Sequence, residues 1–389
     1  MVFHCQEIMK LTSNNKRKKV ILGLSGGVDS AVALYILKKQ GYDVIAVFMR
    51  NWDSALNRDI LGNPTSFDDI CPQERDYQDA LKVANQLGVK LERVDFIKEY
   101  WDRVFTYFLD EYKLNRTPNP DVLCNNEIKF KAFLDYAMTK DVDYIAMGHY
   151  ARVEHTKDGS KLLKGIDKNK DQSYFLSQLT SEQLSKALFP VGDIDKTEVR
   201  EIAHKLGLVV KDKKDSTGIC FIGERDFNKF LSNYLPAKPG KMKRLDGTVI
   251  GDHYGLMNYT IGQRKGLGIG TLDGLDGPWY VVGKDLKTNT LLVENKDNLD
   301  YLKSDEATII NYVWRGPKVN GKYNAKFRYR QADQPVEVEF IDDNKMIVRY
   351  KDIKAVTPGQ VCAIYDGDVC LGSGFIDEVF YKKERRIYS

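Results

Sequence analysis

The stretch that decides the fold is Val20-Ile21-Leu22-Gly23-Leu24-Ser25-Gly26-Gly27-Val28-Asp29-Ser30. Its first five residues form a short, mostly apolar run, which is typical of a buried strand. An apolar-periodic segment follows from Val28 to Lys39 and is closed by Gly41, as expected of a helix. Strand, glycine turn and helix in this order predict the first β-α unit of a parallel sheet.

The same alternation continues through the first half of the chain. It predicts an α/β N-terminal domain over residues 1–224, in which a parallel sheet is covered by helices and residues 1–19 form an extension. We expect strands at 44–49, 89–96 and 144–147, helices at 74–87, 100–112, 128–138, 173–188 and 197–206, and a hairpin over 151–166.

The second half of the chain has a different residue pattern. From about Pro236, closely spaced glycines and Pro-Gly and Asp-Gly turns indicate a small, mostly-β middle domain over 225–285. After Lys284, short alternating runs are split by Asp-Asp, Pro-Gly and Asp-Gly turns. Such runs predict a C-terminal β-barrel over 286–389.

Composition excludes several classes of protein. With 42% hydrophobic and 29% charged residues, the chain is neither disordered nor fibrous. It has no apolar stretch of the roughly 18 to 20 residues that cross a bilayer, and no signal peptide, so we expect a cytoplasmic protein without a membrane partner. Six scattered cysteines without C-x-x-C spacing argue against a disulfide scaffold and a zinc knuckle. The net charge of +4 does not by itself require a polyanionic partner.

The loop Ser25–Ser30 is a candidate phosphate site. Adjacent glycines let backbone N–H groups converge on an anion, and the helix N-terminus adds its positive end. Ser25 and Ser30 can donate hydroxyl hydrogen bonds, whereas Asp29 is better suited to holding a magnesium ion. There is no P-loop lysine. The alternative is a glycine turn that only closes the β-α connection.

Two cysteines have neighbours in the sequence that favour a reactive thiol. Cys124 follows the stiff loop Thr117-Pro118-Asn119-Pro120-Asp121 and is expected in the first turn of a helix, where the dipole favours a thiolate. Cys220 is bracketed by Gly218 and Gly223, so a mobile segment could carry its thiol between two positions. The alternative for both is burial as small hydrophobes, which we expect for Cys362 and Cys370 in barrel strands.

These segments resemble those of a known family. Ser25–Ser30 resembles the PP-loop of the ATP pyrophosphatase superfamily. The two cysteine segments, together with the runs at 48–52, 147–152 and 170–176, are similar to those of the bacterial tRNA-specific 2-thiouridylases, and the runs at 259–268, 278–282, 328–331 and 357–360 match the same family in order. The resemblance covers the chain from about Lys19 to its end. It implies an adenine-nucleotide alpha-hydrolase-like PP-loop fold for the N-terminal domain and a tRNA-binding barrel.

The resemblance also implies a reaction. A tRNA-uridine 2-sulfurtransferase of this family uses ATP and Mg²⁺ to adenylate the C2 oxygen of the wobble uridine, position 34. It then transfers sulfur from a protein persulfide and releases AMP and pyrophosphate. By resemblance, Cys220 is the persulfide carrier, Cys124 the nucleophile and Asp121 a general acid or base, and the two cysteines end each cycle in a transient disulfide. An iron–sulfur cluster on Cys124, Cys220 and Asp121 is the alternative route, since thiolates are the ligands of such clusters.

The family's binding residues carry over by position. ATP contacts are expected from Gly23, Leu24, Ser25, Gly26, Gly27, Val28, Asp29, Ser30, Met49 and Gly148. Target-base contacts are expected from Asn119, Pro120 and Asp121. Contacts to tRNA are expected from His149, Lys170, Asp171, Gln172, Arg328, Tyr329 and Gln360. The implied partners are the anticodon loop of tRNAs for Lys, Glu and Gln, and a cysteine desulfurase or sulfur-relay protein. Two rivals are a PP-loop ligase or amidating enzyme, and a tRNA-binding protein whose ATP site is vestigial.

Overall fold

The computed structural model describes residues 18–65, 68, 70–215, 218–220, 222–270 and 277–388. They divide into two compact units. The first unit contains the described parts of Met1–Val104, Asp121–Asp226 and Asp368–Cys370, and the second contains those of Phe105–Pro120, Phe227–Gly367 and Leu371–Ser389. No helix in the described part of the chain has the length and apolar character that a membrane span requires.

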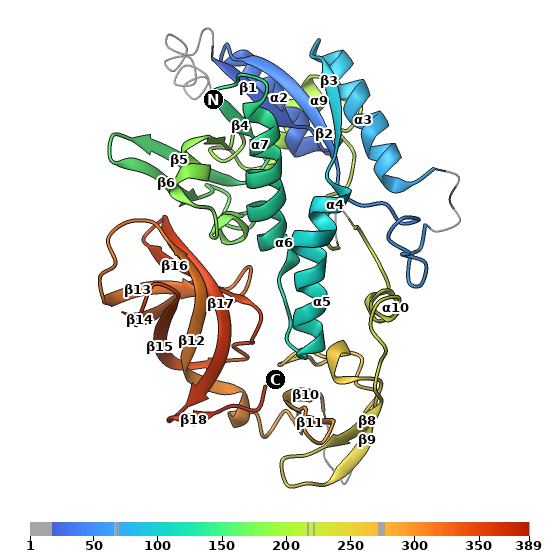
Figure 1. Cartoon of the computed structure of the whole chain (residues 1–389), viewed down its shortest axis with the longest axis vertical. Coiled ribbons are helices and arrows are strands. Elements are labelled where there is room, and N and C mark those ends of the chain that lie inside the picture. Colours follow the sequence, from blue (N-terminus) through green and yellow to red (C-terminus); the bar gives the residue numbers. More distant parts are fainter. Residues whose placement is uncertain are drawn as a thin grey trace. The chain divides into compact units, whose positions relative to one another are not determined.

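A five-stranded parallel sheet forms the centre of the first unit, with the strand order β3-β2-β1-β4-β7. Figure 1 labels β1, β2, β3 and β4 of this sheet. Its strands are β1 (Lys19–Gly23), β2 (Asp43–Arg50), β3 (Leu91–Asp95), β4 (Tyr144–Ala146) and β7 (Ala187–Leu188). Leu22 of β1 is paired with Ala46 on one side and with Ala146 on the other. The strand order therefore reverses at β1, and sheets of this kind bind ligands at the carboxyl ends of the strands beside such a point.

Helices cover this sheet, as the alternation predicts. Alternate strand residues, including Leu22, Ala46 and Phe48, form one core with α2 (Val28–Lys39), α3 (Pro72–Gln86) and α9 (Lys196–Lys205). Further helices are α4 (Ile97–Tyr100), the π-helices η2 (Trp101–Phe105) and η3 (Cys124–Ala132), α6 (Pro120–Leu123), α7 (Phe133–Met138), the 3-10 helix η4 (Ser173–Leu176) and α8 (Ser181–Ser185). The predicted hairpin is β5 (Ala151–Thr156) and β6 (Gly159–Lys164), and Val369 and Cys370 pair with β6.

The second unit begins with helical segments and a small sheet. Its helices are α5 (Thr106–Lys113), α10 (Phe227–Ser232), and the 3-10 turns η5 (Leu256–Asn258) and η6 (Asp300–Leu302). A four-stranded sheet has the order β10-β11-β8-β9, formed by β8 (Gly240–Lys243), β9 (Val249–His253), β10 (Trp279–Asp285) and β11 (Thr290–Asn295). The boundary expected after residue 285 falls between the paired strands β10 and β11.

The C-terminal strands form the predicted barrel. The strand order is β12-β15-β14-β13-β16-β17, and β12 also pairs with β17, which closes the sheet on itself. The strands are β12 (Lys303–Trp314), β13 (Gly321–Lys326), β14 (Gln334–Phe340), β15 (Lys345–Lys354), β16 (Val361–Asp366) and β17 (Val369–Tyr381), and β18 (Glu384–Arg385) pairs with β17. Cys362 and Cys370 are buried, as expected of core residues.

One predicted helix is wrong. Residues 173–188 do not form a continuous helix but the 3-10 turn η4, the short helix α8 and the edge strand β7. The reason is a capping box that starts a new helix: the Thr180 hydroxyl accepts a hydrogen bond from Gln183 N, and Gln183 Oε1 accepts one from Thr180 N. The helix expected at 128–138 starts earlier, at Pro120, and continues through η3 and α7.

Candidate active site

The glycine turn between β1 and α2 is shaped by its own residues. Gly26 has a φ of +76°, and a Cβ at this position would lie 2.2 Å from the Asp76 carbonyl oxygen, so only glycine fits. The Ser30 hydroxyl accepts a hydrogen bond from Ser25 N at 3.2 Å and donates one to Gly27 O at 3.1 Å. Gly27 caps α2 without a side-chain hydrogen bond, so the N–H groups of the first helical turn are left for a ligand.

Residues from two other strand ends reach this turn. A Cβ on Gly148 would lie 2.8 Å from Ser30 N, and a Cβ on Gly23 would lie 2.7 Å from Met147 Sδ and 3.0 Å from Met49 Cε. The structure therefore brings Gly23, Met49 and Gly148 together, three of the residues expected to contact ATP. Leu24 and Val28 lie instead in the core beneath the turn.

Asp29 is held by side chains that the sequence did not single out. Its Oδ1 accepts hydrogen bonds from Tyr150 Oη at 2.6 Å and Lys196 Nζ at 2.7 Å. Lys196 also pairs with Asp215, which is bound in turn by Lys170 at 2.7 Å. Burial opposes the charge of Asp215, but the hydrogen bonds from Lys170 and Lys196 outweigh it and lower its pKa well below the usual range. The second carboxylate oxygen of Asp29 has no hydrogen-bond partner among the described residues, which fits a residue that could also bind a cation.

The fold brings the two candidate thiols together. Cys124 Sγ and Cys220 Sγ lie 3.5 Å apart, although 96 positions separate them in the chain. Cys220 is fixed through its backbone, because its N–H donates to Asp121 Oδ1 at 3.1 Å and its carbonyl accepts from Tyr100 Oη at 2.9 Å. Gly218 and Gly223 both have a positive φ, which lets the chain turn on either side of Cys220. The neighbouring Ser216, Thr217 and Phe221 lie outside the described residues.

The two thiols differ in acidity. Burial, and then the contact with Cys220, raise the pKa of Cys124 well above its usual value. The hydrogen bond from Cys124 and the positive charge of Lys129 lower the pKa of Cys220. Cys124 was expected in the first turn of a helix, but the helical stretch begins at Pro120, so Cys124 lies after that turn, and its side chain is fully buried. Burial also raises the pKa of Asp121, although it accepts a hydrogen bond from Cys220 N.

Two more buried polar groups belong to the same region. The His149 ring packs against Phe130 and Phe189, and its Nδ1 has no hydrogen-bond partner among the described residues. Burial, with a smaller effect of Lys129, lowers the pKa of His149 far enough to keep it neutral. Asn125 donates to Phe175 O, but within the part of the chain that the structure describes its Oδ1 is also without a partner. Neutral, unsatisfied groups suit the edge of a base better than a phosphate.

The remaining residues expected to contact tRNA are placed as follows. Asp171 is buried and accepts hydrogen bonds from Gly165 N, Ser173 N and the Ser173 hydroxyl, and Gln172 Oε1 accepts one from Tyr150 N. Asp171 thus holds its own loop together, and Gln172 binds this loop to Tyr150. Asn119, Pro120, Arg328, Tyr329 and Gln360 belong to the second unit.

Within the second unit, Gln360 also has a structural contact. Its Nε2 donates to Thr117 O at 2.7 Å and to Pro118 O at 3.3 Å, so it supports the stiff segment that contains Asn119 and Pro120. Arg328 is exposed after β13 and Tyr329 beside it is half-buried.

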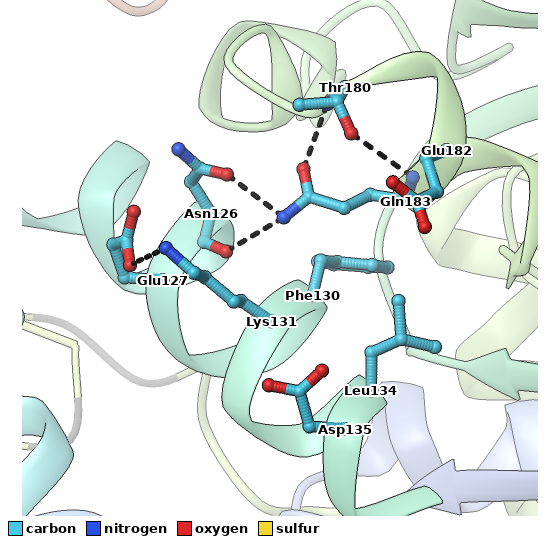
Figure 2. Close-up of a pocket in the computed structure, with 9 residues that line it drawn as sticks. All are labelled: Asn126, Glu127, Phe130, Lys131, Leu134, Asp135, Thr180, Glu182 and Gln183. Atoms are coloured by element: carbon cyan, nitrogen blue, oxygen red, sulfur yellow. Dashed lines mark hydrogen bonds and ion pairs between the residues drawn. The ribbon is translucent and has the colours of Figure 1, made fainter. Parts of the chain in front are cut away.

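A cavity of about 330 Å³ lies between η3, α7 and α8 (Figure 2). Its lining residues are Asn126, Glu127, Phe130, Lys131, Leu134, Asp135, Thr180, Glu182 and Gln183. Lys131 pairs with Glu127 at 2.9 Å, so the charges of Asp135 and Glu182 remain in excess. An excess of carboxylates disfavours phosphate groups, and we therefore do not place ATP or the tRNA backbone in this cavity.

Three family models match successive parts of the chain. Residues 18–224 match a family model described as tRNA methyl transferase HUP domain, residues 228–295 match tRNA methyl transferase PRC-barrel domain, and residues 304–376 match Aminomethyltransferase beta-barrel domain. The chain is 66% identical over 374 residues to a protein of Acholeplasma laidlawii named tRNA-specific 2-thiouridylase MnmA, which covers 96% of this chain and 100% of that protein. The chain belongs to the tRNA-specific 2-thiouridylase family.

Other relatives in the 2-thiouridylase family are similar over the same length. The protein of the same name from Phytoplasma australiense is 58% identical over 375 residues, with 96% of this chain and 100% of that protein covered. The one from Lysinibacillus sphaericus is 52% identical over 385 residues, with 98% and 100% covered. Among solved structures, NMN synthetase from Francisella tularensis aligns with a TM-score of 0.33 at 16% identity, covering 54% of this chain and 73% of that chain.

Proposed function

We propose that this chain is an ATP-dependent enzyme of the cytoplasm that thiolates C2 of the wobble uridine, position 34, of tRNA. The observation that carries the proposal is the 3.5 Å separation of Cys124 Sγ and Cys220 Sγ in the unit that also contains the turn Ser25–Ser30. A ligase or amidating enzyme that shares this turn has no use for paired thiols. The family models are described by methyl transfer, but a reactive thiol pair fits sulfur transfer better.

The nucleotide half of the reaction is assigned to the turn Ser25–Ser30. Its free N–H groups and the N-terminus of α2 would bind phosphate oxygens of ATP, and Asp29 would offer its second carboxylate oxygen to Mg²⁺. When bound, Mg²⁺ neutralises charge on the phosphates. The C2 oxygen of uridine attacks the α-phosphorus and pyrophosphate leaves, so that this oxygen can then depart as part of AMP.

The sulfur half is assigned to the thiols. In one route, a persulfide on Cys220 attacks C2 directly and displaces AMP, and Cys124 then attacks Cys220 Sγ and releases the thiocarbonyl. In the other route, Cys124 attacks Cys220 Sγ first and displaces sulfide, which then attacks C2 and displaces AMP. Both routes leave a Cys124–Cys220 disulfide, so an external thiol must supply two electrons for the next cycle. The sulfur atoms must approach from 3.5 Å to about 2.05 Å, which is a small movement. Asp121, whose pKa burial raises, could accept the Cys124 proton.

The partners follow from this chemistry. A single-stranded anticodon loop, in tRNAs for Lys, Glu and Gln, lets the uridine leave its stack at little cost, and the unpartnered atoms of His149 and Asn125 support a base-binding role nearby. A cysteine desulfurase or a sulfur-relay protein would load Cys220, the more accessible of the two thiols. Asn119, Pro120, Arg328, Tyr329 and Gln360 would contact the tRNA from the second unit.

The test is mass spectrometry of anticodon-loop nucleosides after incubation with tRNA, ATP, Mg²⁺, and a cysteine desulfurase with L-cysteine. We expect one sulfur to be gained at position 34, and both Cys124→Ala and Cys220→Ala to lose at least about a hundredfold in rate. Cys71→Ala is the matched control, since Cys71 is exposed and should not matter. Full turnover by either of the first two variants would exclude the thiol mechanism.

The same preparation separates the cluster route from the persulfide route. Cys124 Sγ and Cys220 Sγ lie 3.5 Å apart, and Asp121 accepts a hydrogen bond from Cys220 N, which supports a thiol pair. Iron content and visible absorbance of anaerobically purified protein measure this directly. Stoichiometric iron that is lost in Cys220→Ala would favour the cluster.

A further inference from the structure

We infer that Lys129 is a further catalytic residue, whose ammonium group holds the Cys220 sulfur as an anion before transfer. The inference rests on the proposed function and names what stabilises its sulfur carrier: a thiolate in the empty enzyme, and a persulfide anion after loading. This role cannot be predicted from the sequence, because Lys129 lies among Lys131 and other polar residues in an ordinary amphipathic run.

The π-helix explains how Lys129 reaches the sulfur atoms. Cys124 and Lys129 are five positions apart, and in an α-helix of 3.6 residues per turn such residues point to different sides. In η3 (Cys124–Ala132) the hydrogen bonds run from i to i+5, so residues five apart come close to one face. Lys129 is half-buried, and η3 places it near the face of Cys124, whose Sγ lies 3.5 Å from Cys220 Sγ. Lys131, in contrast, lies on the cavity wall and pairs with Glu127 (Figure 2).

The titratable groups around Lys129 favour a positive charge on its side chain. Asp121 and the two thiols are the titratable groups that act on it most strongly, and Tyr100 and His149 are further titratable groups of this region. Burial disfavours the ammonium, but Cys220, Cys124 and Asp121 outweigh this effect and raise the pKa of Lys129, so it stays charged. Tyr100 has a strongly raised pKa because it is buried, and His149 is neutral. Lys129 is thus the cation that faces an anion on Cys220.

This arrangement has a chemical consequence for turnover. In the reduced enzyme the anion on Cys220 gains from Lys129, whereas a Cys124–Cys220 disulfide carries no charge and gains nothing. Stabilising the reduced pair makes a disulfide easier to reduce, as in strongly oxidising dithiol proteins. Lys129 would therefore assist both the nucleophilic form of the carrier and its regeneration by an external dithiol, which provides the two electrons.

The first experiment measures the acidity of Cys220 in the full chain. The rate of peptide-resolved labelling by iodoacetamide is followed from pH 6 to pH 10, without tRNA or ATP. We expect the midpoint for Cys220 to rise by at least about one pH unit in Lys129→Met, with about tenfold slower labelling at neutral pH, and to be restored in Lys129→Arg. Lys131→Met is the matched control, because Lys131 is on the same helix but pairs with Glu127. An unchanged midpoint in folded Lys129→Met would overturn the inference.

The second experiment measures the equilibrium between the Cys124–Cys220 disulfide and the dithiol in glutathione buffers. We expect Lys129→Met to favour the disulfide by about tenfold, which corresponds to about 30 mV. If this variant does not fold, Lys129→Gln, which keeps a hydrogen-bond donor but no charge, replaces it in both assays. Neither assay involves thiolation, so a failure of the proposed function would not be mistaken for a failure of this inference. Equal potentials in the wild type and the folded neutral variants would contradict the role of Lys129.

Discussion

Gly26 shows at the scale of one residue how the phosphate turn is specified. Its positive φ and the Asp76 carbonyl 2.2 Å from its Cβ position leave no room for a side chain. Gly27, next to it, has a φ of −97°, and its Cβ would lie 3.5 Å from Ser25 Oγ, which is an ordinary contact. Two adjacent glycines therefore serve different purposes: Gly26 permits the turn, whereas Gly27 could accept a side chain without strain.

We predict that Gly26→Ala lowers the free energy of unfolding by at least about 1 to 2 kcal/mol, since alanine is strained in this conformation and also meets Asp76 O. ATP affinity should fall at least about tenfold. Gly27→Ala is the control and should change stability by less than about 0.5 kcal/mol. Chemical denaturation and ATP titration measure both effects, and equal stabilities of the two variants would refute the argument.

At this scale the sequence predicted some of the site. The turn Ser25–Ser30 and the cysteines could be found because their neighbours in the chain have the required chemistry. Lys129, Tyr150 and Lys196 could not be found in the same way, because each acts on an atom that only the fold brings near: the Cys220 sulfur for Lys129 and Asp29 Oδ1 for the other two.

Among the elements, the strands and long helices of the first unit could be predicted because each has its own apolar period. The π-helix η3 could not, since the same residues would also suit an α-helix. The break within 173–188 was missed, although Thr180 and Gln183 have the spacing of a capping box. The apolar residues on both sides of Thr180 obscured it.

We predict that Thr180→Ala loosens α8 (Ser181–Ser185), because alanine cannot accept the hydrogen bond from Gln183 N. The loss of about 1 kcal/mol should make the amides of this helix exchange about fivefold faster, measured by hydrogen exchange with mass spectrometry. Thr180→Ser keeps the hydroxyl and should exchange like the wild type. Equal exchange in all three proteins would mean that the capping box does not hold α8.

For the whole molecule, the order of three parts could be predicted from the change in residue pattern along the chain. Which segments belong to which compact unit could not be predicted. Phe105–Pro120 precedes the cysteine loop in the chain yet belongs to the second unit. There, Phe108 and Tyr112 of α5 pack against Phe227, with ring centroids 6.3 Å and 5.6 Å away. Contacts between residues more than a hundred positions apart leave no local pattern in the sequence.

The second unit also contains a buried lysine that makes its stability depend on pH. Lys284 is 1% exposed, its Nζ donates to Asn115 O at 2.7 Å, and burial lowers its pKa to about 7. An unfolded lysine keeps its proton up to about pH 10.4. Between these values the unfolded chain binds more protons, so the free energy of unfolding should increase with pH, and below about pH 7 this dependence should vanish.

We predict that, relative to Lys284→Met, the wild type gains about 2 kcal/mol of stability between pH 7 and pH 9. Chemical denaturation at pH 7, 8 and 9 gives the free energy of unfolding of both proteins and so measures the difference. Lys284→Arg stays charged over this whole range and should be less stable than Lys284→Met at every pH. Parallel curves for the wild type and Lys284→Met would show that Lys284 does not titrate in this range.

The complete burial of Cys124 beside a partly accessible Cys220 gives the protein a built-in reporter. A reagent can reach Cys124 only while the surrounding packing is transiently open, so its rate of modification counts those openings. Comparing that rate with and without each substrate would measure how substrate binding changes the frequency of these openings around Cys124. The measurement needs no added label and uses the unaltered chain.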